Sequence, residues 1–171
     1  VSFRPVDVRY DLVEGPRTMG RAVEVSGATA LADDRLRSLM ALSAGRPFYR
    51  PQLDADRDVL ERAFRNEGYQ NASVAPQLAF SPDNGEVGIR WVVRQGPQVQ
   101  VDRILITGNA RTSADLIRRE LVLKPGGPLS EDAMAESQQR LAALGLFRRV
   151  RITELPRTGD SRRDVLVEVE E

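Results

Sequence analysis

Two segments of the chain share one pattern of apolar and polar residues. The segments VDVRYDLVEGP (residues 6–16) and VGIRWVVRQGP (residues 87–97) place an apolar residue at about every second position and end in Gly-Pro. A period of two is typical of a half-buried β-strand. The two final glycines lie 81 residues apart, which is too far for a hairpin and close to the length of one small domain. The pattern therefore predicts a repeated module in which each segment is the last strand.

The residues after each Gly-Pro repeat as well. Residues 21–27 and 101–109 alternate between apolar and polar positions and reach a glycine at Gly27 and Gly108, again 81 residues apart. Each glycine is followed by apolar residues at helical spacing. These residues are Leu36, Leu39 and Met40 after the candidate N-cap Asp33, and Leu116, Ile117 and Leu121 after the candidate N-cap Thr112 or Ser113.

A second helix and a hairpin complete each copy. Ser130 is the expected N-cap of the later helix, with Glu131 and Asp132 in its first turn, and Asp54 and Asp56 are expected to begin the earlier one. The earlier copy is four residues longer here, about one helical turn. The hairpin strands are residues 72–80 and 86–93 around SPDNG in the first copy, and residues 148–155 and 164–170 in the second.

The order strand, helix, helix, strand, strand predicts an α+β fold with two tandem βααββ modules. Residues 17–96 and 97–171 form the two modules, and residues 1–16 are expected to be the terminal strand of a truncated preceding module. We expect few contacts to cross the Gly96-Pro97 linker and a preferred angle between the modules. The residues expected in the second core are Leu116, Ile117, Leu121, Leu141, Leu144, Phe147, Ile104, Ile106, Val165 and Val167.

Composition narrows the functions that the chain can perform. Its 25 basic and 25 acidic residues cancel, which removes the bulk electrostatic argument for binding nucleic acid. It has no cysteine, no histidine and one lysine, so disulfides, thiolate metal sites and the commonest general base are excluded. No run approaches the roughly 18 apolar residues of a membrane-spanning helix. We therefore expect no enzyme, no catalytic residue, and no bound metal or cofactor.

Three groups of residues have two interpretations each: the acid pairs, the single tryptophan and the most basic positions. The acid pairs Asp33-Asp34 and Asp54-Asp56 could hold calcium, but their positions near helix starts favour capping. Trp91 is on the inward side of its strand, which favours core packing over ligand stacking. A solvated face or contact with a partner chain both fit the most basic positions, since aromatic residues do not interleave with them. These positions are Arg118, Arg119, Arg148, Arg149 and Arg151.

The segments GNARTSADLIRREL (residues 108–121) and KPGGPLSEDAMAESQQRLAALGLFRRVRI (residues 124–152) resemble POTRA (polypeptide-transport-associated) domains of the BamA-like family of outer-membrane protein assembly factors. The segment GRPFYRPQLDADRDVLERAFRNEGYQNASV (residues 45–74) is similar to the same module. The resemblance implies two helices on one face of a three-stranded sheet in each module. It also implies a periplasmic arm of a Gram-negative outer-membrane protein, with an adjoining transmembrane β-barrel close to the second module.

The resemblance implies where partners bind. In this family the strand after the second helix lies at the sheet edge, where unpaired backbone groups can accept an added strand. The implied partners are unfolded outer-membrane proteins or extended peptides, and accessory assembly proteins. Pro76 removes one donor from the first edge, which makes the second edge the better docking candidate. The expected binding residues are Ala72, Ser73, Val74, Ala75, Gln77, Leu78, Arg148, Arg149, Val150, Arg151, Ile152, Thr153 and Glu154.

Two alternative functions stay open. POTRA-type structural scaffolds of the division septum join partners and transport nothing, and two-partner secretion transporters carry similar modules before a barrel. The residues beyond Glu171 discriminate between a barrel and a scaffold, because a barrel requires many alternating strands of about ten residues.

Overall fold

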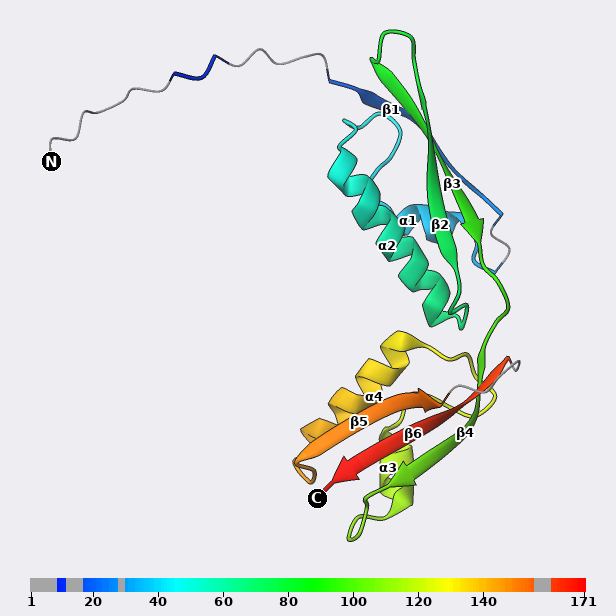
Figure 1. Ribbon diagram of the computed structural model, residues 1–171, viewed down its shortest axis with the longest axis vertical. Helices are drawn as coiled ribbons and strands as arrows, with labels where there is room; N and C mark the ends of the chain where they lie inside the picture. Colours follow the sequence, from blue (N-terminus) through cyan, green and yellow to red (C-terminus); the bar gives the residue numbers. More distant parts are fainter. Residues whose placement is uncertain (1–8, 12–16, 28–29, 156–160) are drawn as a thin grey trace, which may run out of the picture.

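The computed structural model describes residues 9–11, 17–27, 30–155 and 161–171. The elements of the first module are β1 (Met19–Ser26), α1 (Asp33–Leu39), α2 (Arg50–Asn66), β2 (Ser73–Phe80) and β3 (Glu86–Arg94). Those of the second are β4 (Gln100–Thr107), α3 (Ala114–Glu120), α4 (Glu131–Ala143), β5 (Arg149–Leu155) and β6 (Arg162–Glu170). The predicted α+β fold with two βααββ modules is confirmed (Figure 1). The strand predicted within residues 1–16 lies almost wholly outside the described residues.

Each module folds around one three-stranded mixed sheet, with the strand order β1-β3-β2 in the first and β4-β6-β5 in the second. The first strand of each module runs parallel to its last strand, and the two hairpin strands pair antiparallel. The last strand is therefore central and pairs on both sides. The strand after the second helix lies at an edge, as the family resemblance implied.

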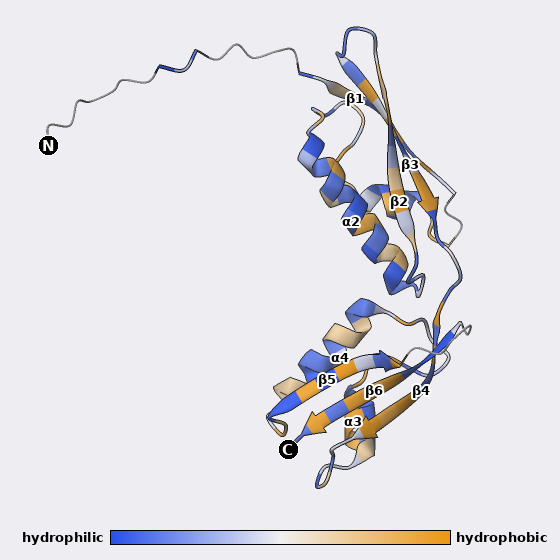
Figure 2. Cartoon of the chain, in the orientation of Figure 1, coloured by the Kyte–Doolittle hydropathy of each residue, from blue (hydrophilic) through white to orange (hydrophobic). Residues whose placement is uncertain are grey.

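The two helices of each module cover one face of its sheet (Figure 1). Along β3 the side chains alternate, so that Ile89, Trp91 and Val93 are buried beneath the helices while Arg90 is exposed. Trp91 has no exposed surface, which confirms the prediction of core packing. Hydrophobic and hydrophilic residues alternate along α2 in Figure 2.

The second core contains every residue predicted for it except Leu116, which is partly exposed and lies outside the cluster. Leu141 has no exposed surface and is the central contribution of α4. The other buried members from the prediction are Ile117, Leu121, Val165 and Val167, and those packed against them are Ile104, Ile106, Leu144 and Phe147.

Glycine is required where the first strand of each module turns towards the first helix. Gly27 and Gly108 have φ angles of 81° and 84°, a left-handed conformation that residues with a side chain rarely adopt. A Cβ at either position would collide with a carbonyl oxygen of the central strand, that of Val93 or that of Val169. These glycines therefore permit the close approach of the first strand to the central one.

The observed N-caps of the helices match the predicted ones in the second module and differ from them in the first. Ser113 and Ser130 are the N-caps of α3 and α4, and each hydroxyl accepts a backbone N–H three residues on, at 3.4 and 3.1 Å. The N-cap of α1 is Ala32, and Asp33 is the first residue of the helix rather than its cap.

The prediction that Asp54 and Asp56 begin a helix is wrong, because α2 starts one turn earlier. Asp56 is buried, and its carboxylate accepts the backbone N–H of Leu42 at 2.8 Å. In the second module Ser137 has the same role and accepts the N–H of Val122 at 2.9 Å. Both side chains connect the second helix to the segment that follows the first.

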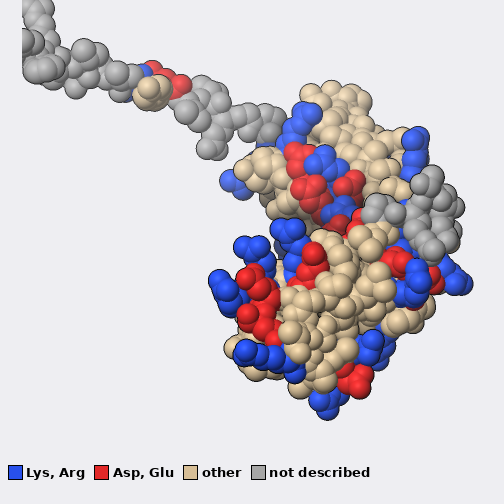
Figure 3. Space-filling model, turned by 60° about the horizontal axis from the view of Figure 1, so that its bottom comes forward, with Lys and Arg blue, Asp and Glu red and all other residues tan. Residues whose placement is uncertain are grey.

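Polar contacts join the two modules where the end of α2 meets the start of α4, and they are few compared with the contacts within each module. The side chain of Asn66 donates to the Asp132 carboxylate and accepts the backbone N–H of Asp132 at 3.0 Å. Arg62 forms an ion pair with Asp132, and Arg65 forms one with Glu131 at 3.0 Å. Opposite charges lie side by side in this region of the surface (Figure 3).

The chemistry of a helix start explains this joint. The first turn of α4 has N–H groups without an acceptor in the preceding turn of the helix and a partial positive charge, which favour the acidic side chains Glu131 and Asp132. These acids in turn attract Arg62 and Arg65. The hydrogen bond from Arg62 to Asp132, together with the charge of that carboxylate, raises the pKa of the Arg62 guanidinium. The joint is therefore an electrostatic contact as well as a covalent linker.

The four-residue difference between the copies supplies part of the joint. The helix α2 has 17 residues, whereas α4 has 13. Arg65 and Asn66 belong to the additional turn of α2. Close to it, the carbonyl of Gly68 accepts the N–H of Val99 at 2.8 Å, so the linker is also held by the backbone.

Replacement of Leu141 tests the second core. Leu141→Ala should lower the free energy of unfolding by about 2–5 kcal/mol, because it leaves a cavity among buried side chains. Leu146→Ala is the matched control, since half of that side chain is exposed, and it should change stability by about 0.5 kcal/mol or less. Denaturant unfolding followed by circular dichroism measures both. Equal effects would contradict the packing described for α4.

Replacement of Asn66 tests the joint. Asn66→Ala removes the side chain that bonds both the backbone and the carboxylate of Asp132, so the distribution of orientations between the modules should widen. The chain has no cysteine, and cysteines introduced at the exposed positions Asp58 and Gln139 allow spin labelling of one helix in each module. Pulsed electron resonance gives the distance distribution, with Arg118→Ala as a control on the far helix α3. An unchanged width would show that Asn66 does not restrain the modules.

Candidate functional site

The sheet edges formed by β2 and β5 are the candidate site. The opposite edges, β1 and β4, are bulged near their starts and partly covered by the segment that precedes the second helix. In the second module, for example, the N–H of Val101 donates to Gly127 and the N–H of Gly126 donates to Val101, at 2.9 and 2.8 Å. Bulges and covering segments hinder strand addition. The edges β2 and β5 are therefore the better places for a partner strand.

The register of the first hairpin shows which N–H groups of β2 point outward. The N–H of Ser81 donates to Glu86 across the hairpin at 2.9 Å, and paired residues alternate along an antiparallel ladder. The N–H groups at even positions of β2 therefore face away from β3. These outward positions are Val74, Pro76, Leu78 and Phe80.

Half of these outward positions on β2 offer no free donor. The N–H of Val74 donates to the carboxylate of Glu61, a residue of α2, at 3.1 Å. Pro76 has no N–H at all. Only Leu78 and Phe80, at the hairpin end of the strand, remain available. The first edge is thus closed along its first half.

The second module lacks both obstructions. Gly27 packs against Val93 as Gly108 packs against Val169, so the two sheets align and Ile152 stands where the first module has Pro76. The outward donors of β5 are therefore those of Val150, Ile152 and Glu154.

The position equivalent to Glu61 is Ala142 in α4, five residues after Ser137 as Glu61 follows Asp56. Alanine cannot reach the strand. Within the described residues, neither a proline nor a side-chain acceptor obstructs the outward N–H groups of β5.

The structure brings the predicted site residues together as two strands with alternating faces. On β5 the side chains of Arg149, Arg151 and Thr153 lie on the open face, and those of Val150 and Ile152 face the core. On β2 the open face carries Ser73, Ala75 and Gln77, and the covered face carries Val74 and Leu78. Ala72 and Arg148 lie one residue before their strands.

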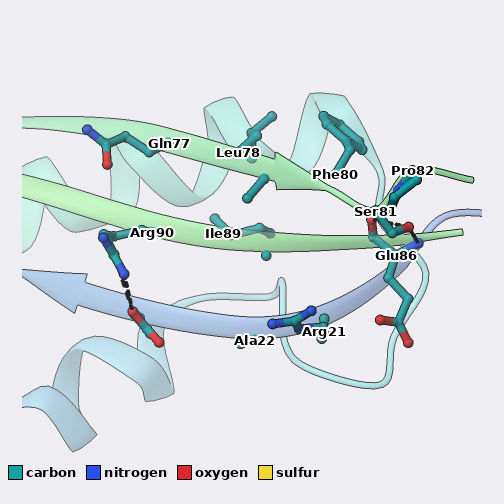
Figure 4. A pocket seen from close by; sticks show the side chains of 13 residues that line it. Arg21, Ala22, Gln77, Leu78, Phe80, Ser81, Pro82, Glu86, Ile89 and Arg90 are labelled. Atoms are coloured by element: carbon teal, nitrogen blue, oxygen red, sulfur yellow. Dashed lines mark hydrogen bonds and ion pairs between the residues drawn. The ribbon is translucent and has the colours of Figure 1, made fainter. Parts of the chain in front are cut away.

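Sequence reasoning missed a hollow on the first module and the function of Glu61. The hollow has a volume of about 550 Å³ at the hairpin end of the sheet, and small residues such as Gly88 leave space in it. Its rim includes Phe80 and the ion pair of Arg90 with Glu24 (Figure 4). An alignment of the two copies places Glu61 opposite Ala142, and this difference in the sequence could have indicated the function of Glu61.

Neither metal binding nor membrane insertion through a helix is supported by the described residues. Their acidic side chains form no cluster suited to a metal ion. Every helix among them is too short or too polar to cross a membrane.

Comparison with family models places both modules in one family. Residues 21–96 and 99–171 each match POTRA, described as a surface antigen variable number repeat. The chain belongs to the POTRA family. Tandem POTRA modules are thereby confirmed, and so is the prediction of a non-enzymatic chain.

Curated relatives of these POTRA modules are assembly factors. The outer membrane protein assembly factor BamA of Neisseria meningitidis serogroup B is 24% identical over 153 residues, which are 89% of this chain and 19% of that protein. BamA of Neorickettsia risticii is 28% identical over 147 residues, which are 85% of this chain and 20% of the relative. The chain thus spans about a fifth of the length of these relatives.

Solved POTRA structures have the same fold. The crystal structure of Haemophilus influenzae BamA POTRA3-5 has a TM-score of 0.65 at 22% identity, over 90% of this chain and 61% of that one. BamA from Haemophilus ducreyi lacking POTRA domains 1-3 has a TM-score of 0.68 at 24% identity, over 93% of this chain and 29% of that one.

Proposed function

We propose that these POTRA modules are a periplasmic part of a BamA-like outer-membrane protein assembly factor that binds unfolded outer-membrane proteins by strand addition to β5. The names of the relatives support the assembly role. The observation that carries the mechanism is the uninterrupted row of outward donors on β5. The full-length protein would join these modules to a transmembrane β-barrel, near the second module.

Strand addition suits a receptor for many different substrates. Backbone N–H and C=O groups are common to every extended peptide, so pairing with them demands little of the side-chain sequence. Each hydrogen bond contributes only about 0.5–1.5 kcal/mol net, and a flexible peptide must be ordered on binding. Binding is therefore weak and reversible, which allows a substrate to be released towards the barrel.

The two edges have different roles under this proposal. On β5, the residues from Arg148 to Glu154 form the substrate edge. On β2, Glu61 and Pro76 limit pairing near Ala72 to Gln77, so this strand contributes mainly through Leu78 and its hairpin end. An accessory subunit is the partner that we assign to this shorter edge. A purely structural scaffold is the alternative, and the joint of Asn66 with Asp132 would serve it equally well.

Proline on the second edge tests strand addition. Glu154→Pro removes an outward N–H from an exposed position without changing the core, and should weaken peptide binding roughly twofold to tenfold, the contribution of one hydrogen bond. Glu154→Ala keeps the N–H and is the control. An amide chemical-shift titration with an extended peptide of about ten residues measures both affinities. Equal affinities for the two variants, or shifts confined to the helices, would favour the scaffold.

Opening the first edge tests the obstruction by Glu61 and Pro76. The double variant Glu61→Ala, Pro76→Ile gives β2 the residues that the second module has at these positions, so the same peptide should now shift the amides of residues 74–78. Glu61→Gln alone retains a side-chain acceptor for Val74 and should leave the edge closed. If the peptide shifts the amides of β5 but not those of β2 in the double variant, Glu61 and Pro76 are not what prevents pairing at β2.

A further inference from the structure

Two arginines stand on the open face of β5. Arg149 and Arg151 are exposed, and neither forms an ion pair within the part of the chain that the structure describes. Their register partners on β6 are Glu170 and Glu168. These four residues, with Val169, line a shallow hollow of about 230 Å³ beside the free edge.

The fold itself does not require arginine at these positions. Ser73 and Ala75 are the equivalent residues of β2, and the first sheet forms the same ladder with these small side chains. The charges therefore distinguish the open edge from the closed one. Arg149 and Arg151 lie on the edge strand itself, directly beside the position that an added strand would occupy.

We infer that β5 selects an added strand in which apolar residues alternate with acidic ones. This inference rests on the proposed strand addition and deepens it. In an extended sheet, side chains on neighbouring strands stand about 5 Å apart at Cβ and interact directly. The open-face residues of the partner would lie beside Arg149 and Arg151, and its covered-face residues beside Val150 and Ile152.

The charges already present on β5 and β6 favour acidic over basic residues on the open face of an added strand. An acidic residue opposite Arg151 would complete a row in which the carboxylate of Glu168, the guanidinium and the new carboxylate alternate. A lysine would instead place two like charges opposite each other, which destabilises a cross-strand pair. A neutral residue such as threonine would have neither effect.

Three peptides test this selectivity, each titrated into the natural chain, which contains both modules. Each has about ten residues, with valine at alternate positions and glutamate, threonine or lysine at the others. Amide titrations of the isotope-labelled chain should show the glutamate peptide binding β5 roughly two- to fivefold more tightly than the threonine peptide for each arginine engaged. The lysine peptide should bind least. The differences should shrink at about 1 M salt, where screening is nearly complete.

The matched variant carries the residues of the first module. Arg149→Ser with Arg151→Ala should abolish the ranking while the threonine peptide still binds. Equal binding of all three peptides to the natural edge, or a ranking that persists in the double variant, would overturn the acidic preference and leave strand addition standing. The absence of β5 shifts with every peptide would overturn strand addition itself, and the preference with it.

Discussion

The pairing of the last strand on both of its sides is the constraint on which each module depends. Because β1 runs parallel to β3, and β4 to β6, the hairpin can add its other strand only at the remaining side of the central one. The strand after the second helix must then lie at an edge, with alternate backbone groups unpaired. Glycines at positions 27 and 108 make this close parallel pairing possible. The exposed edge is thus a consequence of how the core is built.

Duplication gives the chain two copies of this edge that differ in their outward backbone groups. In the first module, a glutamate side chain and a proline obstruct two successive outward positions. In the second module, Ala142 and Ile152 occupy those places, and the edge is open. Both modules retain a buried core despite these differences. The helical turn that lengthens α2 reaches α4 and joins the modules, so the differences between the copies account for both the joint and the different accessibility of the two edges.

The fold could be predicted from the sequence because its signals are local and occur twice. Strand alternation, helical spacing and Gly-Pro ends are periodic patterns that neighbouring residues carry, and the edge position of β5 followed from the family resemblance. Contacts between distant segments could not be predicted in this way. Asp56 resembles a residue of a first turn, although burial gives it a backbone N–H to bind. The pairing of Asn66 with Asp132 depends on an inter-module angle that no local pattern specifies, and the bond from Val74 to Glu61 depends on how a helix lies over a strand.

Amide hydrogen exchange, read residue by residue, tests most directly whether the second edge is open and the first is obstructed. In the free chain, the amides of Val150, Ile152 and Glu154 should exchange quickly, while those of Arg151 and Thr153 between them are protected by β6. On β2, the amide of Val74 should be protected by Glu61 although it faces away from β3. Uniform protection along β5, or rapid exchange at Val74, would contradict this account of the two edges.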